Sequence, residues 1–161
     1  MTRNLWLACV AAVWVVADPA AARADVTAFL GVSPTGAVRL STGGAAGAGL
    51  VVVGFEVEAA RLAERVSSGA PGLRTGMANL LLQMPIDVSR MQFYGTAGVG
   101  VYRETLGPLQ ETSVGGNIGG GVKVKLAGPL RLRIDYRLFR LRGAPVNATY
   151  HRLYSGVNLR F

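Results

Sequence analysis

The sequence predicts an all-β fold, an eight-stranded antiparallel up-and-down transmembrane β-barrel. The first observation is that apolar and polar residues alternate along most of the chain, which gives an extended strand one oily and one wet face. The second is that mean hydropathy is positive, although no stretch after residue 24 approaches the roughly 18 apolar residues that a membrane helix needs. A membrane barrel combines these properties because alternation dilutes its apolar residues.

Residues 1–24 are predicted to be a cleaved secretory signal peptide. Arg3 lies in a short polar start, an apolar run extends from residue 5 to residue 16, and Ala22-Arg23-Ala24 has the small residues of a cleavage site. The apolar run is too short for a membrane-spanning helix. We therefore expect the mature chain to be exported.

Residues 25–161 are expected to form one barrel domain without disulfides. The only cysteine, Cys9, lies in the leader; a lipoprotein acylated there is the alternative, but only eight residues precede it. The chain is basic, with a formal net charge of +8. Its basic residues recur at every second position rather than in a run, which is strand geometry, so we expect no nucleic-acid partner.

Eight segments have the pattern of strands. They are residues 26–32, 37–46, 50–60, 73–84, 91–104, 114–125, 130–141 and 150–161. Pro34 and Gly36 end the first strand, and the second is rich in glycine and has the weakest pattern. The stretch Gly47-Ala48-Gly49 is predicted to form a turn that leads into the third strand. Pro85 is predicted to end the fourth strand.

The later strands alternate more clearly. A loop at 105–112 is predicted to separate the fifth strand from the sixth, and Ala127-Gly128-Pro129 is a tight turn. The seventh strand has the clearest alternation, with apolar Leu130, Leu132, Ile134, Tyr136 and Leu138 opposite Arg131, Arg133, Asp135 and Arg137. A last loop at 143–149 precedes the final strand.

The predicted links differ between the two rims. Those near Gly47, Asp87 and Gly128 are short, and those at 61–72, 105–112 and 143–149 are longer. The link at Pro34 breaks the pattern. Membrane barrels have short periplasmic turns and longer outer loops, and an even number of strands places both ends of the domain on the short-turn rim.

Energy decides which face meets lipid. An arginine at the bilayer midplane costs roughly 2 to 4 kcal/mol, so the charged face is predicted to line the lumen. The opposite polarity would give a soluble lipocalin-like carrier of a greasy ligand, which is the less favoured alternative. The predicted lumen charges are Glu56, Glu58, Lys123, Lys125, Arg131, Arg133, Asp135, Arg137, Arg152 and Arg160.

The interior of an eight-stranded barrel is just filled by side chains. We expect the lumen charges to pair and to close the barrel, and the alternative is a narrow pore for small anionic solutes. Inward glycines are expected to leave room for Tyr94, Tyr102 or an arginine from a neighbouring strand. They are Gly98, Gly100, Gly115, Gly119 and Gly121.

The end of the chain carries a family resemblance. Leu153, Ser155, Val157, Leu159 and Phe161 share one face of the last strand, and Arg152, Tyr154, Gly156, Asn158 and Arg160 share the other. With a terminal Phe and a glycine five positions before it, this strand resembles the last strand of bacterial outer-membrane β-barrels. The whole mature chain resembles the small eight-stranded barrels that include the barrel portion of OmpA-like proteins, without a periplasmic domain after it.

The resemblance implies a bacterial outer-membrane location and contact with outer-membrane lipid. It also implies that the barrel-assembly machinery reads a signal formed by Tyr154, Gly156, Leu159 and Phe161, that periplasmic chaperones take part in biogenesis, and that the barrel is a monomer. The expected contribution is to membrane structure or to surface contact through the loops.

A catalytic site is not expected. Lipid A deacylases of this size use a His-x-Ser pair on the outer face, but the residue two positions after His151, the single histidine, is Leu153. One histidine and a mature chain without cysteine give no metal-ligand pattern, and no stretch fits a nucleotide-binding glycine motif, so no cofactor is expected. The sequence therefore predicts a non-enzymatic barrel.

Overall fold

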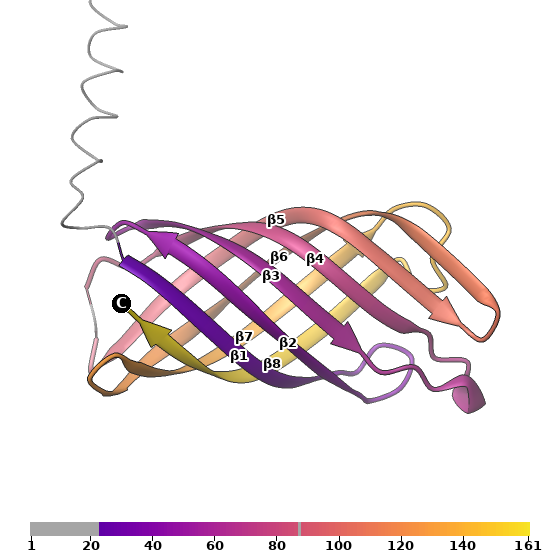
Figure 1. Ribbon diagram of the computed structural model, residues 1–161, viewed down its shortest axis with the longest axis horizontal. Helices are drawn as coiled ribbons and strands as arrows, with labels where there is room; N and C mark the ends of the chain where they lie inside the picture. The colour runs from indigo at the N-terminus through magenta and orange to yellow at the C-terminus, as the bar shows by residue number, and fades with distance from the viewer. Residues whose placement is uncertain (1–22, 87) are drawn as a thin grey trace, which may run out of the picture.

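The computed structural model describes residues 23–86 and 88–161, which form a closed antiparallel barrel in which each strand pairs with its sequence neighbours and β1 pairs with β8 (Figure 1). The strands are β1 (Arg23–Ser33), β2 (Arg39–Gly49), β3 (Val53–Leu62), β4 (Gly72–Gln83), β5 (Met91–Leu106), β6 (Leu109–Ala127), β7 (Leu130–Leu141) and β8 (Thr149–Arg160). The predicted fold class is confirmed. The predicted leader lies outside the described residues, apart from Arg23 and Ala24, which begin β1.

Burial alternates along the strands as the period of two requires. On β7 the charged residues from Arg131 to Arg137 are buried, and Ile134 and Tyr136 between them are exposed. The outer wall exposes large apolar side chains, among them Phe55 at 68% and Val99 at 70%. The predicted polarity is therefore confirmed: the charged face points into the barrel and the apolar face points out. No helix in the described part of the chain is long and apolar enough to span a membrane.

The predicted loop at 105–112 is wrong. β5 continues to Leu106 and β6 begins at Leu109, so that only Gly107 and Pro108 connect them, with Gly107 at a positive φ of 57°. The polar residues of this stretch pair across the two strands, as Glu104 does with Glu111. Where strands extend past the apolar band of the barrel, both of their faces can carry polar residues. The polar composition of residues 105–112 therefore did not indicate a loop.

The predicted turn at 47–49 is also wrong. These residues belong to β2 and pair with both β1 and β3, and the turn is formed by residues 50–52, so β3 begins at Val53 instead of Leu50. A Cβ on Gly47 would lie 2.7 Å from the carbonyl oxygen of Phe55. A glycine is required here because two strands approach closely. The composition of a glycine-rich stretch does not distinguish such an approach from a turn.

The two ends of the barrel differ. The β2–β3, β4–β5 and β6–β7 links lie at one end, together with Arg23 and Phe161, and we call this the turn end (Figure 1). The loop end carries the links at 34–38, 63–71, 107–108 and 142–148, of which the second contains the short 3-10 helix η2 (Val66–Ser68).

Candidate functional site

The lumen is filled in three levels, which are the candidate functional site. Nearest the loop end is an apolar cluster, here called the apolar plug. It consists of Leu62, Leu73, Met77, Tyr102, Phe139, Leu141 and Tyr150. Every member is buried, so side chains close the loop-end half of the lumen.

Ionised side chains fill the middle of the lumen. This central charge cluster consists of Glu56, Glu58, Asp135, Arg133, Arg137 and Arg152. Three carboxylates meet three guanidinium groups, so the cluster is electrically balanced. Its members come from β3, β7 and β8, whose inward positions converge inside the barrel.

Arg133 connects one side of the cluster. Its guanidinium donates to Glu56 and lies 3.1 Å from Asp135. Its Nε donates to the Tyr94 hydroxyl at 2.7 Å, and Tyr94 in turn donates to Asp135. The guanidinium also lies 4.9 Å from the centre of the Tyr94 ring, within the range of a cation–π contact.

Arg137 contacts all three acids of the cluster. Its nitrogens lie 2.8 Å from Glu56, 2.9 Å from Glu58 and 3.0 Å from Asp135. Arg152 donates to Glu58. Each carboxylate of the cluster therefore contacts two arginines, which offsets the large cost of removing the charges from water.

The third level, at the turn end, holds three further basic residues of the lumen. Lys123 forms an ion pair of 2.6 Å with Asp25, while Arg131 and Arg160 donate to Gln92 at 3.1 and 3.4 Å. Asp25 and Arg160 are partly exposed at this level, whereas the members of the central charge cluster are buried.

The structure brings together six of the ten predicted lumen charges, among them Arg152, which pairs with Glu58. The six that meet in the central charge cluster are Glu56, Glu58, Arg133, Asp135, Arg137 and Arg152. Lys123, Arg131 and Arg160 lie at the turn end, and Lys125 is exposed there. Sequence reasoning missed Tyr94 and Asp25 as partners; the inward parity of Tyr94 was the available signal.

The predicted role of the inward glycines is confirmed at two positions. A Cβ on Gly121 would lie 2.6 Å from the Tyr94 hydroxyl oxygen, and one on Gly119 would lie 3.0 Å from Cγ of Arg137. These β6 glycines therefore make room for side chains of the central charge cluster.

Residues of the predicted assembly signal divide between the two faces of β8. Tyr154 is buried and stacks on Phe29 of β1 at 4.1 Å between ring centres, and a Cβ on Gly156 would lie 2.8 Å from Cβ of Phe29. Leu159 and Phe161 point outward, and the Phe161 N–H donates to the Ala24 carbonyl at 2.8 Å. Tyr154 and Gly156 thus pack the junction of β1 and β8.

The single histidine lies on the outer wall. Nδ1 of His151 is 2.7 Å from the Tyr136 hydroxyl, on the neighbouring strand β7. Across residues 23–86 and 88–161 there is no group of three side chains suited to hold a metal ion.

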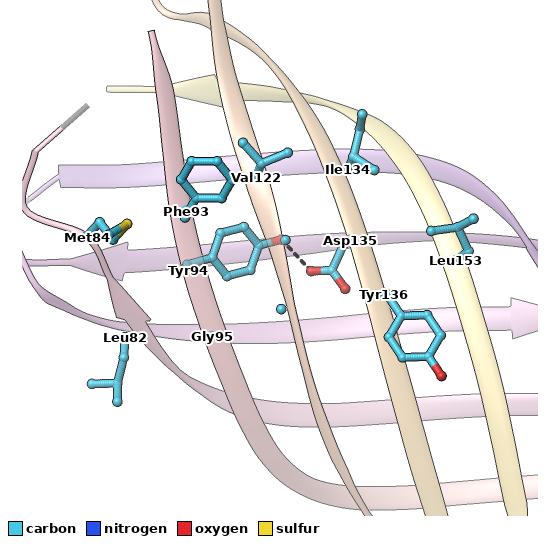
Figure 2. A pocket seen from close by; sticks show the side chains of 12 residues that line it. Leu82, Met84, Phe93, Tyr94, Gly95, Val122, Ile134, Asp135, Tyr136 and Leu153 are labelled. Atoms are coloured by element: carbon cyan, nitrogen blue, oxygen red, sulfur yellow. Dashed lines mark hydrogen bonds between the residues drawn. The ribbon is translucent and has the colours of Figure 1, made fainter. Parts of the chain in front are cut away.

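The outer wall is hollowed where small residues face outward. Figure 2 shows one groove beside Gly95, with Phe93, Val122 and Ile134 around it. The hydrogen bond between Tyr94 and Asp135 lies on the lumen side of the same strands, which separates the groove from the central charge cluster.

Three solved structures are similar to this chain. Neisserial surface protein A aligns with a TM-score of 0.67 and 21% identity over 87% of this chain and 96% of its own. The N-terminal β-barrel domain of Pseudomonas aeruginosa OprF aligns with a TM-score of 0.64 and 13% identity over 86% and 97%. The outer membrane enzyme PagL aligns with a TM-score of 0.52 and 12% identity over 84% and 98%.

No protein-family model matches the sequence, and no curated protein matches it. At these identities the structural similarity establishes the fold alone. The chain therefore has the fold of the eight-stranded outer-membrane β-barrels, in agreement with the resemblance of its last strand and strand count.

Proposed function

We propose that the protein is a non-enzymatic integral barrel of the bacterial outer membrane with a closed lumen, which contributes to membrane structure or to surface contact through its loops. The observation that carries the proposal is the central charge cluster. Its ionic groups neutralise one another in the middle of the barrel, and the apolar plug lies directly beyond it.

The polarity of the wall supports membrane insertion. Phe55, Val57 and Val99 point outward with about seven-tenths of their surface exposed, while Arg133 and Arg137 are completely buried. A soluble lipocalin-like carrier requires the reverse arrangement, with an apolar lumen for its ligand. We propose that the same wall contacts outer-membrane lipid.

The closed lumen is favoured over a narrow anion pore. The basic residues at the turn end, Lys123, Arg131 and Arg160, give that end an excess of positive charge. Anions that enter there meet the balanced cluster, in which the guanidinium groups already hold carboxylates. We propose that anions can enter the lumen at the turn end but cannot pass the central charge cluster.

A non-enzymatic role is proposed although PagL is an enzyme. The histidine side chain contacts a tyrosine hydroxyl on the outer wall, and the outward residue that follows His151 on the same strand is Leu153. The His-x-Ser pair that a lipid A deacylase would use is therefore absent at this position. We also propose the barrel-assembly machinery and periplasmic chaperones as partners in biogenesis, a monomeric state, and no nucleic-acid partner.

Ion conductance across a planar lipid bilayer tests the closed lumen. The chain is refolded into detergent, folding is verified by heat-modifiable migration in gel electrophoresis, and the folded protein is added to the bilayer. We expect insertion without discrete conductance steps. Steps that favour anions in the same verified sample would contradict the closed lumen and support the pore.

A further inference from the structure

Three arginines form a row on the outer wall near the loop end. Arg61 of β3 lies directly opposite Arg74 of β4, and Arg74 lies directly opposite Arg103 of β5. All three side chains are exposed and share the outward face. Directly paired residues of neighbouring strands have Cβ atoms about 5 Å apart, so the arginine row concentrates three positive charges within about 10 Å.

Like charges directly opposite each other destabilise a sheet, so the row needs a counter-charge. Within the described ranges no carboxylate lies at ion-pair distance from any of the three; Arg103 donates to the Thr112 hydroxyl at 3.3 Å. The nearby carboxylates at this end accept hydrogen bonds from backbone N–H groups of the loops instead. Glu64 accepts from the Gly107 N–H at 2.7 Å, and Glu104 accepts from the Val146 N–H at 2.6 Å.

An apolar groove lies on the turn-end side of the row and is formed by β2, β3, β4 and β5. Its floor is formed by Ala46, Ala48, Ala78 and Ala97, and its walls by Phe55, Val57, Leu80 and Val99. Gly76 lies between Arg74 and Ala78 on the outward face, and a Cβ there would touch only Val101, at 3.8 Å. The surface is therefore open from the arginine row down into the groove.

The row and the groove together are long enough to hold a lipid headgroup and the first part of an acyl chain. Arg74 and Leu80 are six positions apart on β4, which corresponds to about 20 Å of strand. Tilted strands in a hydrocarbon layer of about 30 Å would carry the groove from the rim of the membrane well into its interior. In Figure 1, β3, β4 and β5 are neighbouring strands of the barrel wall, and their ends at the loop end lie away from the chain termini.

We propose that the arginine row and the groove together form a binding site for a phosphorylated glycolipid of the outer leaflet, of the lipid A class. The guanidinium groups bind its phosphates, and one acyl chain lies between Val57 and Val99. Three cations in a row match a lipid with two phosphate groups better than a phospholipid with one. The inference rests on the proposed outer-membrane location, which places the loop end at the outer leaflet.

Binding is measured by native mass spectrometry of the refolded chain released from detergent micelles. The probes are bisphosphorylated lipid A, the same lipid without phosphates, and phosphatidylglycerol. We compare the wild type with the triple variant Arg61→Ser, Arg74→Ser and Arg103→Ser, and with Ala78→Phe, which fills the groove. The matched control is Arg140→Ser, because Arg140 is exposed on the outward face of β7 and the residues directly opposite it are Gly116 and Thr149, neither of which is an arginine.

We expect the wild type to prefer bisphosphorylated lipid A over both other lipids. The triple variant should lose affinity by about a hundredfold, because three arginines that attract anionic lipid are removed together. Ala78→Phe should weaken the binding of all three lipids, and Arg140→Ser should change none. Every variant lies on the outer wall, and heat-modifiable migration verifies that each one folds.

Equal affinity for lipid A with and without phosphates would overturn the inference, as would an equal loss in Arg140→Ser and the triple variant. A preference for phosphatidylglycerol would exclude the glycolipid as occupant. If the wild type folds in detergent and inserts into vesicles but shows no lipid preference, only this inference fails. If it does not insert at all, the proposed membrane barrel fails first, and the site fails with it.

Discussion

Nη1 of Arg137 lies 2.9 Å from Oε2 of Glu58 inside the barrel, and both side chains are completely buried. Glu58 also accepts from Arg152, which comes from the last strand. The pair therefore joins β3, β7 and β8 through charges that water does not reach, and its removal should have large effects.

We predict that Glu58→Gln lowers the free energy of unfolding by about 3 to 5 kcal/mol, because two buried arginines lose a charged partner. Urea unfolding of the refolded barrel, followed by heat-modifiable migration, measures the change. Glu64→Gln is the control, since Glu64 is exposed. In the double variant Glu58→Gln, Arg152→Gln the loss should be smaller than the sum of the two single losses; strict additivity would show that the pair is not coupled.

Tyr94→Phe should cost about 1 to 3 kcal/mol. Its hydroxyl accepts from Arg133 and donates to Asp135, so the variant leaves two buried charged groups short of a partner. Tyr136→Phe removes a hydroxyl from the outer wall and should change stability by less than about 0.5 kcal/mol. Equal effects in the two variants, measured by the same unfolding experiment, would contradict the interior role of Tyr94.

Gly121→Ala should destabilise the barrel by about 1 to 3 kcal/mol, because the added methyl group would lie 2.3 Å from the Ile134 carbonyl oxygen. Gly95→Ala provides the comparison: its methyl group would point outward and lie 3.9 Å from the nearest atom. Thermal stability in detergent measures both variants. A tolerated Gly121→Ala would mean that β6 can move away from β7 without loss of pairing.

Glu104→Gln should loosen the β7–β8 loop while the barrel stays closed. The carboxylate accepts from the Tyr150 hydroxyl at 2.5 Å and from the Val146 N–H at 2.6 Å. Hydrogen exchange should become faster at residues 142–148. Glu64→Gln should instead affect Gly107, whose N–H donates to Glu64. No change in exchange at 142–148 would show that the loop is held by other contacts.

The faces of the strands were predictable and the ends of the strands were not. Alternation places Arg133 and Asp135 on one side, and the cost of an arginine in lipid decides that this side is inward. The polar stretch at 105–112 and the glycines at 47–49 have compositions typical of loops, and only pairing with neighbouring strands distinguishes them from loops.

The charges of the lumen were predictable as a set, but their partners were not. The contact of Glu58 with Arg152 depends on how far each strand is shifted along the closed barrel, and a period of two carries no information on that shift. The role of Tyr94 depends in the same way on Gly121, which gives its ring room on the neighbouring strand.

The contact of Tyr154 with Phe29, at the junction of β8 and β1, has a kinetic consequence. The two residues lie far apart in the sequence. Until they meet, β1 and β8 each have an unpaired edge whose backbone groups find no hydrogen-bond partner in lipid. The arginine of β8 reaches its acid on β3 only when the same junction forms. Insertion should therefore be all-or-none: a partly assembled barrel would hold an open edge and an uncompensated charge at the same time.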